Sequence, residues 1–144
     1  MKRWFFSYGM TETCGTCTKT FPFDPTCSGT IGPPQPVNEI KLVDVPSMGY
    51  TSEDKPHPRG ELCVRGVNCF TAYHKGTYMS RERRRRCANT ATDEKNTKNT
   101  LDSEGWLHSG DVAEVDSFGR FKVIDRIKVR YLILWTGLSS HLVY

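Results

Sequence analysis

The stretch "DVAEVDSFGRFKVID", residues 111–125, decides the fold class that this sequence predicts. Strand-like runs stand on both sides of the turn-forming "DSFG" segment. A short turn between two such runs is typical of a hairpin. We therefore predict two antiparallel strands, at residues 112–116 and 121–125.

Two further strands are predicted upstream of this hairpin. They lie at residues 40–45, in "VNEIKLVDV", and at residues 61–65, in "GELCVRG", with a turn-rich connection between them. Asp93 is a candidate N-cap and Gly105 a stop signal, which together predict a short helix. The stretch "TFPFDPTCSGTIGPPQP", residues 20–36, favours loops and turns. The predicted fold class is mainly β: an antiparallel, partly barrel-like unit with one or two short helices.

The arginine run "RERRRRC", residues 81–87, supplies the whole positive balance of the chain. The sequence has 20 basic and 16 acidic residues, and without this run 15 of each remain. A general preference for polyanions is therefore not expected, although a local nucleic-acid-binding or targeting role for the run stays an alternative. No apolar run approaches the roughly 18 residues of a membrane-spanning helix.

The six cysteines favour reduced, intracellular thiols over a secreted disulfide scaffold. Cys63, in the strand-like "ELCVRG", is interpreted as a small buried hydrophobic residue. Cys14 and Cys17 form a single CxxC motif, without a second pair or a nearby histidine. Because a structural zinc ion needs four ligands, zinc or redox chemistry at this motif is the weaker alternative.

Three short stretches carry residue types suited to nucleotide chemistry. "YGMTE", residues 8–12, combines an aromatic ring, a glycine, a hydroxyl and a carboxylate, which could stack a base, approach a phosphate and hold Mg²⁺. "WLHSGD" ends in Asp111, where an exposed carboxylate could accept both hydroxyls of a ribose. "GRFKVIDRIK" ends with Arg126 and Lys128 on one strand face. Taken singly, each stretch is better explained as a turn, a helix cap or a solvated strand edge.

The order of these stretches is more specific than any one of them. "YGMTE", "GELCVRG", "GWLHSGD" and "GRFKVIDRIK" in succession resemble the adenylate-forming superfamily, and specifically the long-chain fatty acyl-CoA synthetases. The segment "DSEGWLHSGDVAEVDSFGRFKVIDRIK", residues 102–128, looks like the signature region of those synthetases. The resemblance implies that the β unit is a fragment of a larger α/β enzyme.

The resemblance also implies roles for seven residues. In the first motif, Tyr8 would lie against the adenine, Gly9 beside the nucleotide, Thr11 at the AMP phosphate and Glu12 at Mg²⁺. Thr11 and Glu12 would also act in catalysis. Those near the end are Asp111 and Arg126 at the ribose, and Lys128 at the hinge between a large and a small domain.

The activity implied by the resemblance is a two-step ligation. A fatty acid and ATP form an acyl-adenylate with Mg²⁺, and coenzyme A then takes the acyl group. Fatty acid and coenzyme A are the implied partners, with no nucleic acid and no transmembrane segment. Peripheral membrane association and an intracellular site, on the cytosolic face of the endoplasmic reticulum or a lipid-rich organelle, are also implied. We expect these 144 residues to be inactive alone; a non-catalytic nucleotide-binding fragment remains the alternative.

Five segments are expected along the chain. A leader (1–7), an insertion (76–92) and a tail (129–144) should lie outside the family, whereas 8–75 and 93–128 should form the end of an AMP-binding domain and its hinge. The genetic code allows splice signals at each boundary, so our hypothesis is that the three non-family segments derive from introns. We expect the insertion and the tail to make no core contacts, because arginine-rich sequence has little to bury.

Overall fold

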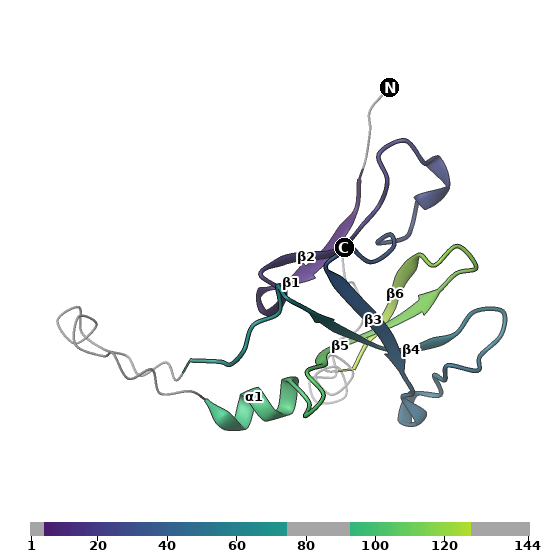
Figure 1. The fold of residues 1–144 in the computed structure, drawn as a ribbon. Coiled ribbons are helices and arrows are strands. Elements are labelled where there is room, and N and C mark those ends of the chain that lie inside the picture. Colours follow the sequence, from purple (N-terminus) through teal and green to yellow (C-terminus); the bar gives the residue numbers. More distant parts are fainter. Residues whose placement is uncertain (1–4, 75–92, 128–144) are drawn as a thin grey trace, which may run out of the picture.

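A four-stranded antiparallel sheet dominates the computed structural model, which describes residues 5–74 and 93–127 (Figure 1). Its strands lie side by side in chain order: β3 (Asn38–Val43), β4 (Arg59–Gly66), β5 (Leu107–Val115) and β6 (Phe121–Arg126). Because every pair is antiparallel, each connection can run between neighbouring strand ends. The mainly antiparallel fold predicted from the sequence is confirmed.

All four predicted strands are present, although their ends differ. The largest difference is in β5, which begins at Leu107 rather than at residue 112. Its first residues lack clear alternation but pair with Cys63 and Val64 of β4. The described strands β3 to β6 form an open sheet with β3 and β6 at its edges. The partly barrel-like unit that was predicted is therefore not a closed barrel in the described part of the chain.

A separate hairpin, formed by β1 (Ser7–Met10) and β2 (Gly15–Lys19), was missed by the sequence analysis. These strands are short, and the pairing is irregular between Tyr8 and Gly9. A Cβ on Gly9 would lie 1.9 Å from the carbonyl oxygen of Gly15, so only glycine permits this close approach of the two strands. The hairpin therefore depends on a missing side chain, which alternation patterns do not detect.

The helical elements are short. Helix α1 (Glu94–Thr100) begins where expected, because the Asp93 side chain accepts a hydrogen bond from the backbone N–H of Asn96. It ends before the predicted stop at Gly105. Single 3₁₀ turns complete the described helices, at η1 (Thr11–Thr13), η2 (Pro25–Cys27) and η3 (Pro46–Met48).

The core lies between the sheet and the β1–β2 hairpin. Leu62 and Val64 alternate along β4 and pack with Ala113 of β5, Phe121 of β6 and Cys17 of β2, all buried. Because successive side chains of a strand point to opposite faces, the residues between these core positions occupy the other face of β4. One face of the sheet thus forms the core, and the opposite face is free for polar chemistry.

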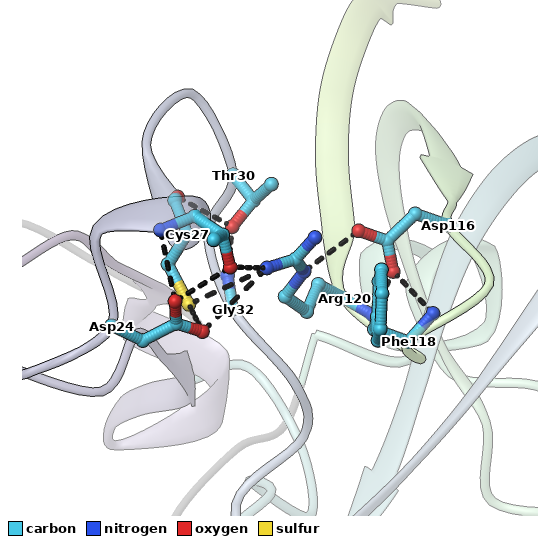
Figure 2. Close-up of polar contacts among 8 residues, drawn as sticks. Asp24, Cys27, Thr30, Gly32, Asp116, Phe118 and Arg120 are labelled. Carbon is cyan, nitrogen blue, oxygen red and sulfur yellow. Dashed lines mark hydrogen bonds and ion pairs between the residues drawn. The ribbon is translucent and has the colours of Figure 1, made fainter.

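Arg120 fastens the loop that contains η2 to the β5–β6 turn, as Figure 2 shows. Its Nε lies 2.7 Å from Oδ2 of Asp116, and a terminal nitrogen lies 2.7 Å from the hydroxyl of Thr26 and 3.6 Å from Oδ2 of Asp24. Asp24 in turn accepts hydrogen bonds from Thr26 and from the thiol of Cys27. One guanidinium therefore joins two carboxylates that are 92 positions apart in the sequence.

This cluster should contribute to acid sensitivity. Hydrogen bonds from the side chain of Thr26, and then from Cys27, lower the pKa of Asp24 from 3.8 to about 2. A carboxyl with a lowered folded-state pKa stabilises the fold above about pH 4, and that stabilisation is lost as the pH falls toward 2. We expect Asp24→Asn to lower stability at neutral pH and to reduce the further loss between pH 4 and 2, measured as urea midpoints.

Glu53→Gln, a change at an exposed position, is the matched control and should follow the wild-type pH profile. Identical acid profiles for Asp24→Asn and the wild type would contradict the role assigned to Asp24.

Candidate functional site

The carboxylate of Asp111 brings together side chains from both ends of the described chain. The Tyr8 hydroxyl donates a hydrogen bond of 2.6 Å to Oδ2, across 103 sequence positions. Nε of Arg126 lies 2.9 Å from Oδ1, as an ion pair between residues that face each other on β5 and β6. Three of the residues predicted for the nucleotide site therefore meet at one carboxylate.

An irregular stretch of β5 positions this carboxylate. Gly110 has a φ of 74°, in the left-handed region that favours glycine. The Ser109 hydroxyl accepts a hydrogen bond of 3.1 Å from the backbone N–H of Asp111. The backbone N–H of Gly110 donates a hydrogen bond of 3.0 Å to Oε1 of Glu61, on the neighbouring strand. The pairing of β5 shifts register with β4 and with β6 near this point, and such irregularities redirect side chains.

Asp111 is buried, which the sequence analysis did not anticipate. Its residue exposure is 7%, whereas an exposed carboxylate was expected; that expectation is wrong, because Tyr8 and Arg126 cover it. Burial, followed by the hydrogen bond to Asp111 and the charge of Asp111, raises the pKa of Tyr8 above its ordinary value of 10.0. The phenol therefore remains a neutral donor, while the Arg126 side chain is 63% exposed.

Thr11 and Glu12 lie in η1, the turn that directly follows the strand carrying Tyr8. Oε1 of Glu12 accepts a short hydrogen bond from the hydroxyl of Tyr73, and the Glu12 carbonyl accepts the N–H of Phe70 at 2.7 Å. Glu12 is half-buried and the side chain of Thr11 is exposed. The end of β1 thus presents a hydroxyl and a carboxylate beside the segment 70–73.

The remaining predicted residues have different outcomes. Gly9 faces the backbone of Gly15, which gives this glycine a packing role in addition to the predicted nucleotide contact. Lys128, the predicted hinge, lies outside the described residues, as do the expected insertion 76–92 and the tail 129–144. The residues proposed to contact AMP and Mg²⁺ remain predictions.

A second polar cluster was missed by the sequence analysis. Sγ of Cys63 lies 3.4 Å from Nδ1 of His108, and this nitrogen lies 2.9 Å from Oε2 of Glu61. The predicted burial of Cys63 is confirmed, and burial, followed by the charge of Glu61, raises the pKa of its thiol to about 12. Spacing within "ELC" could have placed Glu61 and Cys63 on one face, but His108 required the register of β5.

Comparison with known proteins decides the family. A family model described as "AMP-binding enzyme" matches residues 3–74, half of the chain. The chain belongs to this family of AMP-binding enzymes. The match begins within the segment 1–7 that was expected to lie outside the family, and the exact boundary near residue 8 stays a prediction.

The AMP-binding chain is also similar to long-chain synthetases. It is 46% identical to the peroxisomal long chain acyl-CoA synthetase 6 of Arabidopsis thaliana, over 84% of the chain and 15% of that relative. It is 43% identical to long-chain-fatty-acid–CoA ligase 6 of Rattus norvegicus, over 84% of the chain and 14% of that protein. The chain therefore spans about 15% of the length of these curated relatives.

Solved structures of adenylate-forming enzymes share the fold. The o-succinylbenzoate coenzyme A synthetase of Bacillus subtilis, in complex with AMP, gives a TM-score of 0.60 at 29% identity, over 88% of this chain and 27% of that one. The adenylation domain of a carboxylate reductase from Mycobacterium chelonae gives 0.58 at 32% identity, over 86% and 15%. The β unit of the AMP-binding chain is thus a portion of an adenylate-forming fold.

The raised pKa of Tyr8 should make the fold sensitive to alkali. Because the unfolded phenol ionises near pH 10 and the folded one does not, stabilisation by Tyr8 is complete below pH 10 and is lost as the pH rises. One proton corresponds to at most about 1.4 kcal/mol per pH unit. Above pH 10, the free energy of unfolding of Tyr8→Phe should therefore fall less steeply with pH than that of the wild type, by up to this amount per pH unit. Urea titrations at several pH values measure the difference. An unchanged alkaline slope would contradict the burial of this phenol.

Proposed function

We propose that this chain forms the nucleotide-binding part of a long-chain fatty acid–CoA ligase. The observation that carries the proposal is the meeting of Tyr8, Asp111 and Arg126 at one carboxylate, in a chain that belongs to the AMP-binding enzymes. Similarity to long-chain synthetases of a plant and a mammal supports a fatty acid as the substrate.

Asp111 suits a ribose because its hydrogen-bonding capacity is only half used. Each carboxylate oxygen can accept two hydrogen bonds, and Oδ1 and Oδ2 each hold one donor from the protein. Two acceptor positions remain, which is the number that the two ribose hydroxyls require. The exposed side chain of Arg126 can provide the second ribose contact, and the ring of Tyr8 provides an apolar surface for the adenine.

The end of β1 is proposed to bind the phosphate. Thr11 has an exposed hydroxyl that can donate to a phosphate oxygen, and Gly9 keeps the nearby backbone free of a side chain. Glu12 uses one oxygen on Tyr73, and its second oxygen has no partner among the described residues. An oxygen of this kind suits Mg²⁺, which when bound would offset the charge that gathers on the phosphates.

In the proposed parent reaction, the carboxylate of a fatty acid attacks the α-phosphorus of ATP and pyrophosphate leaves. The thiol of coenzyme A then attacks the acyl carbon, loses its proton, and AMP leaves. The residues of this chain would hold the nucleotide through both steps: Asp111 and Arg126 fix the ribose, and Thr11 donates to the phosphate. Lys128 is proposed as the hinge of the domain rotation that separates the steps.

The proposed location follows from the same resemblance. A long-chain fatty acid is available at lipid surfaces, so we propose peripheral association with the cytosolic face of the endoplasmic reticulum or of a lipid-rich organelle, without a nucleic-acid partner. Within residues 5–74 and 93–127, no helix combines the length and apolar character needed to cross a bilayer.

Calorimetric titration of the 144-residue chain with AMP tests the nucleotide site. We expect the folded wild type to bind, and Asp111→Asn to bind at least about tenfold more weakly, because hydrogen bonds to a charged group contribute roughly 1.5–3 kcal/mol. Glu114→Gln is the matched control on the same strand; its carboxylate pairs with Lys122 at the surface, so its affinity should be unchanged. Equal binding by Asp111→Asn and the wild type would overturn the assignment.

Acyl-CoA formation separates binding from catalysis. With oleate, ATP, Mg²⁺ and coenzyme A, we expect the 144-residue chain to show no turnover above background. The chain spans about 15% of the length of the long-chain synthetases that it matches, and each charged or donor group lacking from a site typically costs about 10²–10³ in rate. Turnover that disappears in Glu12→Ala would show instead that these residues suffice.

A further inference from the structure

Three side chains with different ligand atoms meet on the face of the sheet opposite the core. Glu61 and Cys63 are two positions apart on β4 and therefore point to the same face. His108 lies on β5 directly opposite Cys63 in the strand register. A carboxylate oxygen, a thiol and an imidazole nitrogen thus lie within 4.8 Å of one another, on two strands at the centre of the sheet.

One separation in the cluster equals that between ligands of a tetrahedral metal ion, and a second is shorter. Zinc binds sulfur at about 2.3 Å and nitrogen or oxygen at about 2.0–2.1 Å, so tetrahedral ligands lie about 3.3–3.6 Å apart. Sγ of Cys63 and Nδ1 of His108 are 3.4 Å apart, within that range. Nδ1 and Oε2 of Glu61 are 2.9 Å apart, so a side-chain shift of a few tenths of an ångström completes the geometry.

We propose that Glu61, Cys63 and His108 form a binding site for one Zn²⁺-like ion, separate from the proposed nucleotide site. The mixture of sulfur, nitrogen and oxygen ligands suits a borderline-soft transition metal, whereas Mg²⁺ and Ca²⁺ prefer oxygen ligands alone. Three protein ligands leave the fourth position for water or another small ligand.

The surroundings of His108 support this assignment. Its second ring nitrogen, Nε2, lies 3.7 Å from Oδ2 of Asp102. A carboxylate facing the free nitrogen of a metal-bound histidine is the usual means of orienting the ring. On metal binding, the ring proton would reside on Nε2 toward Asp102, and the thiol proton of Cys63 would be released to solvent.

One positive side chain, that of Lys41, lies close enough for its charge to act on Cys63 and on Asp102. Lys41 lies opposite Cys63 on β3, but its ammonium group is 4.4 Å from the centre of the Trp106 ring and 3.9 Å from a carboxylate oxygen of Glu104. Glu61 and Asp102, both close to His108, together outweigh the one positive charge of Lys41, so the local charge balance still favours a cation.

Titration of the reduced 144-residue chain with Co²⁺ tests the site, because cobalt replaces zinc and reports thiolate ligation by a near-ultraviolet charge-transfer band. We expect one Co²⁺ per folded chain, displaced by Zn²⁺. Cys63→Ser should remove the band, and Asp102→Asn should weaken binding by about 10- to 100-fold, as is typical when a group that orients a ligand is lost. Absence of the band in the folded wild type would overturn the proposal.

Cysteines outside the cluster provide the matched control. In the double variant Cys14→Ser/Cys87→Ser the band should persist, since neither residue belongs to the cluster. If the band disappears there, the metal binds at the other thiols and the proposal is wrong. If Cys63→Ser fails to fold, His108→Gln is compared with the double variant. A zinc-induced rise in Tm that is present in the double variant and lost in His108→Gln supports the proposal, and a rise that persists in His108→Gln contradicts it.

Discussion

The buried carboxylate of Asp111 is the constraint on which the arrangement of the described chain depends. A desolvated charge is costly unless it is paired and hydrogen-bonded. Here the compensation comes from two directions, from Tyr8 on the β1–β2 hairpin and from Arg126 on the edge strand β6. The need to satisfy one charge therefore holds the hairpin on the sheet, and the same hydrogen bond gathers the residues proposed to bind a nucleotide.

This arrangement suits both stability and the proposed recognition of a nucleotide. The protein donors leave acceptor positions on Asp111, so the proposed ribose contact does not require the bond to Tyr8 to break. Arg126 differs from Tyr8 because its side chain is largely in solvent and can change partners at little cost. Asp111 thus has one fixed partner, Tyr8, and one adaptable partner, Arg126. At the opposite end of β6, the Arg120 cluster connects this strand to the loop that contains η2 (Figure 2).

The sequence predicts those features that repeat locally. Strand β3 was predicted because its residues alternate, and β4, β5 and β6 because strand-like runs flank turn residues. Helix α1 was predicted because Asp93 is a strong N-cap. The β1–β2 hairpin was missed because it depends on the contact between Gly9 and Gly15, and the burial of Asp111 because Tyr8 lies 103 positions away. The nucleotide-site residues were proposed from the order of short motifs and stay a prediction. The cluster with His108 depends on strand register, which a single sequence does not encode locally.

Glu61 has a consequence that extends across the sheet. Its Oε2 faces His108, while its Oε1 holds the N–H of Gly110, the residue before Asp111. The two oxygens belong to one planar group, so neither can move without the other. Any ligand, proton or substitution that rotates this carboxylate must also displace the peptide that aims Asp111. The two polar regions of the molecule are therefore linked through a single side chain, and a displacement at His108 is transmitted to the backbone beside Asp111.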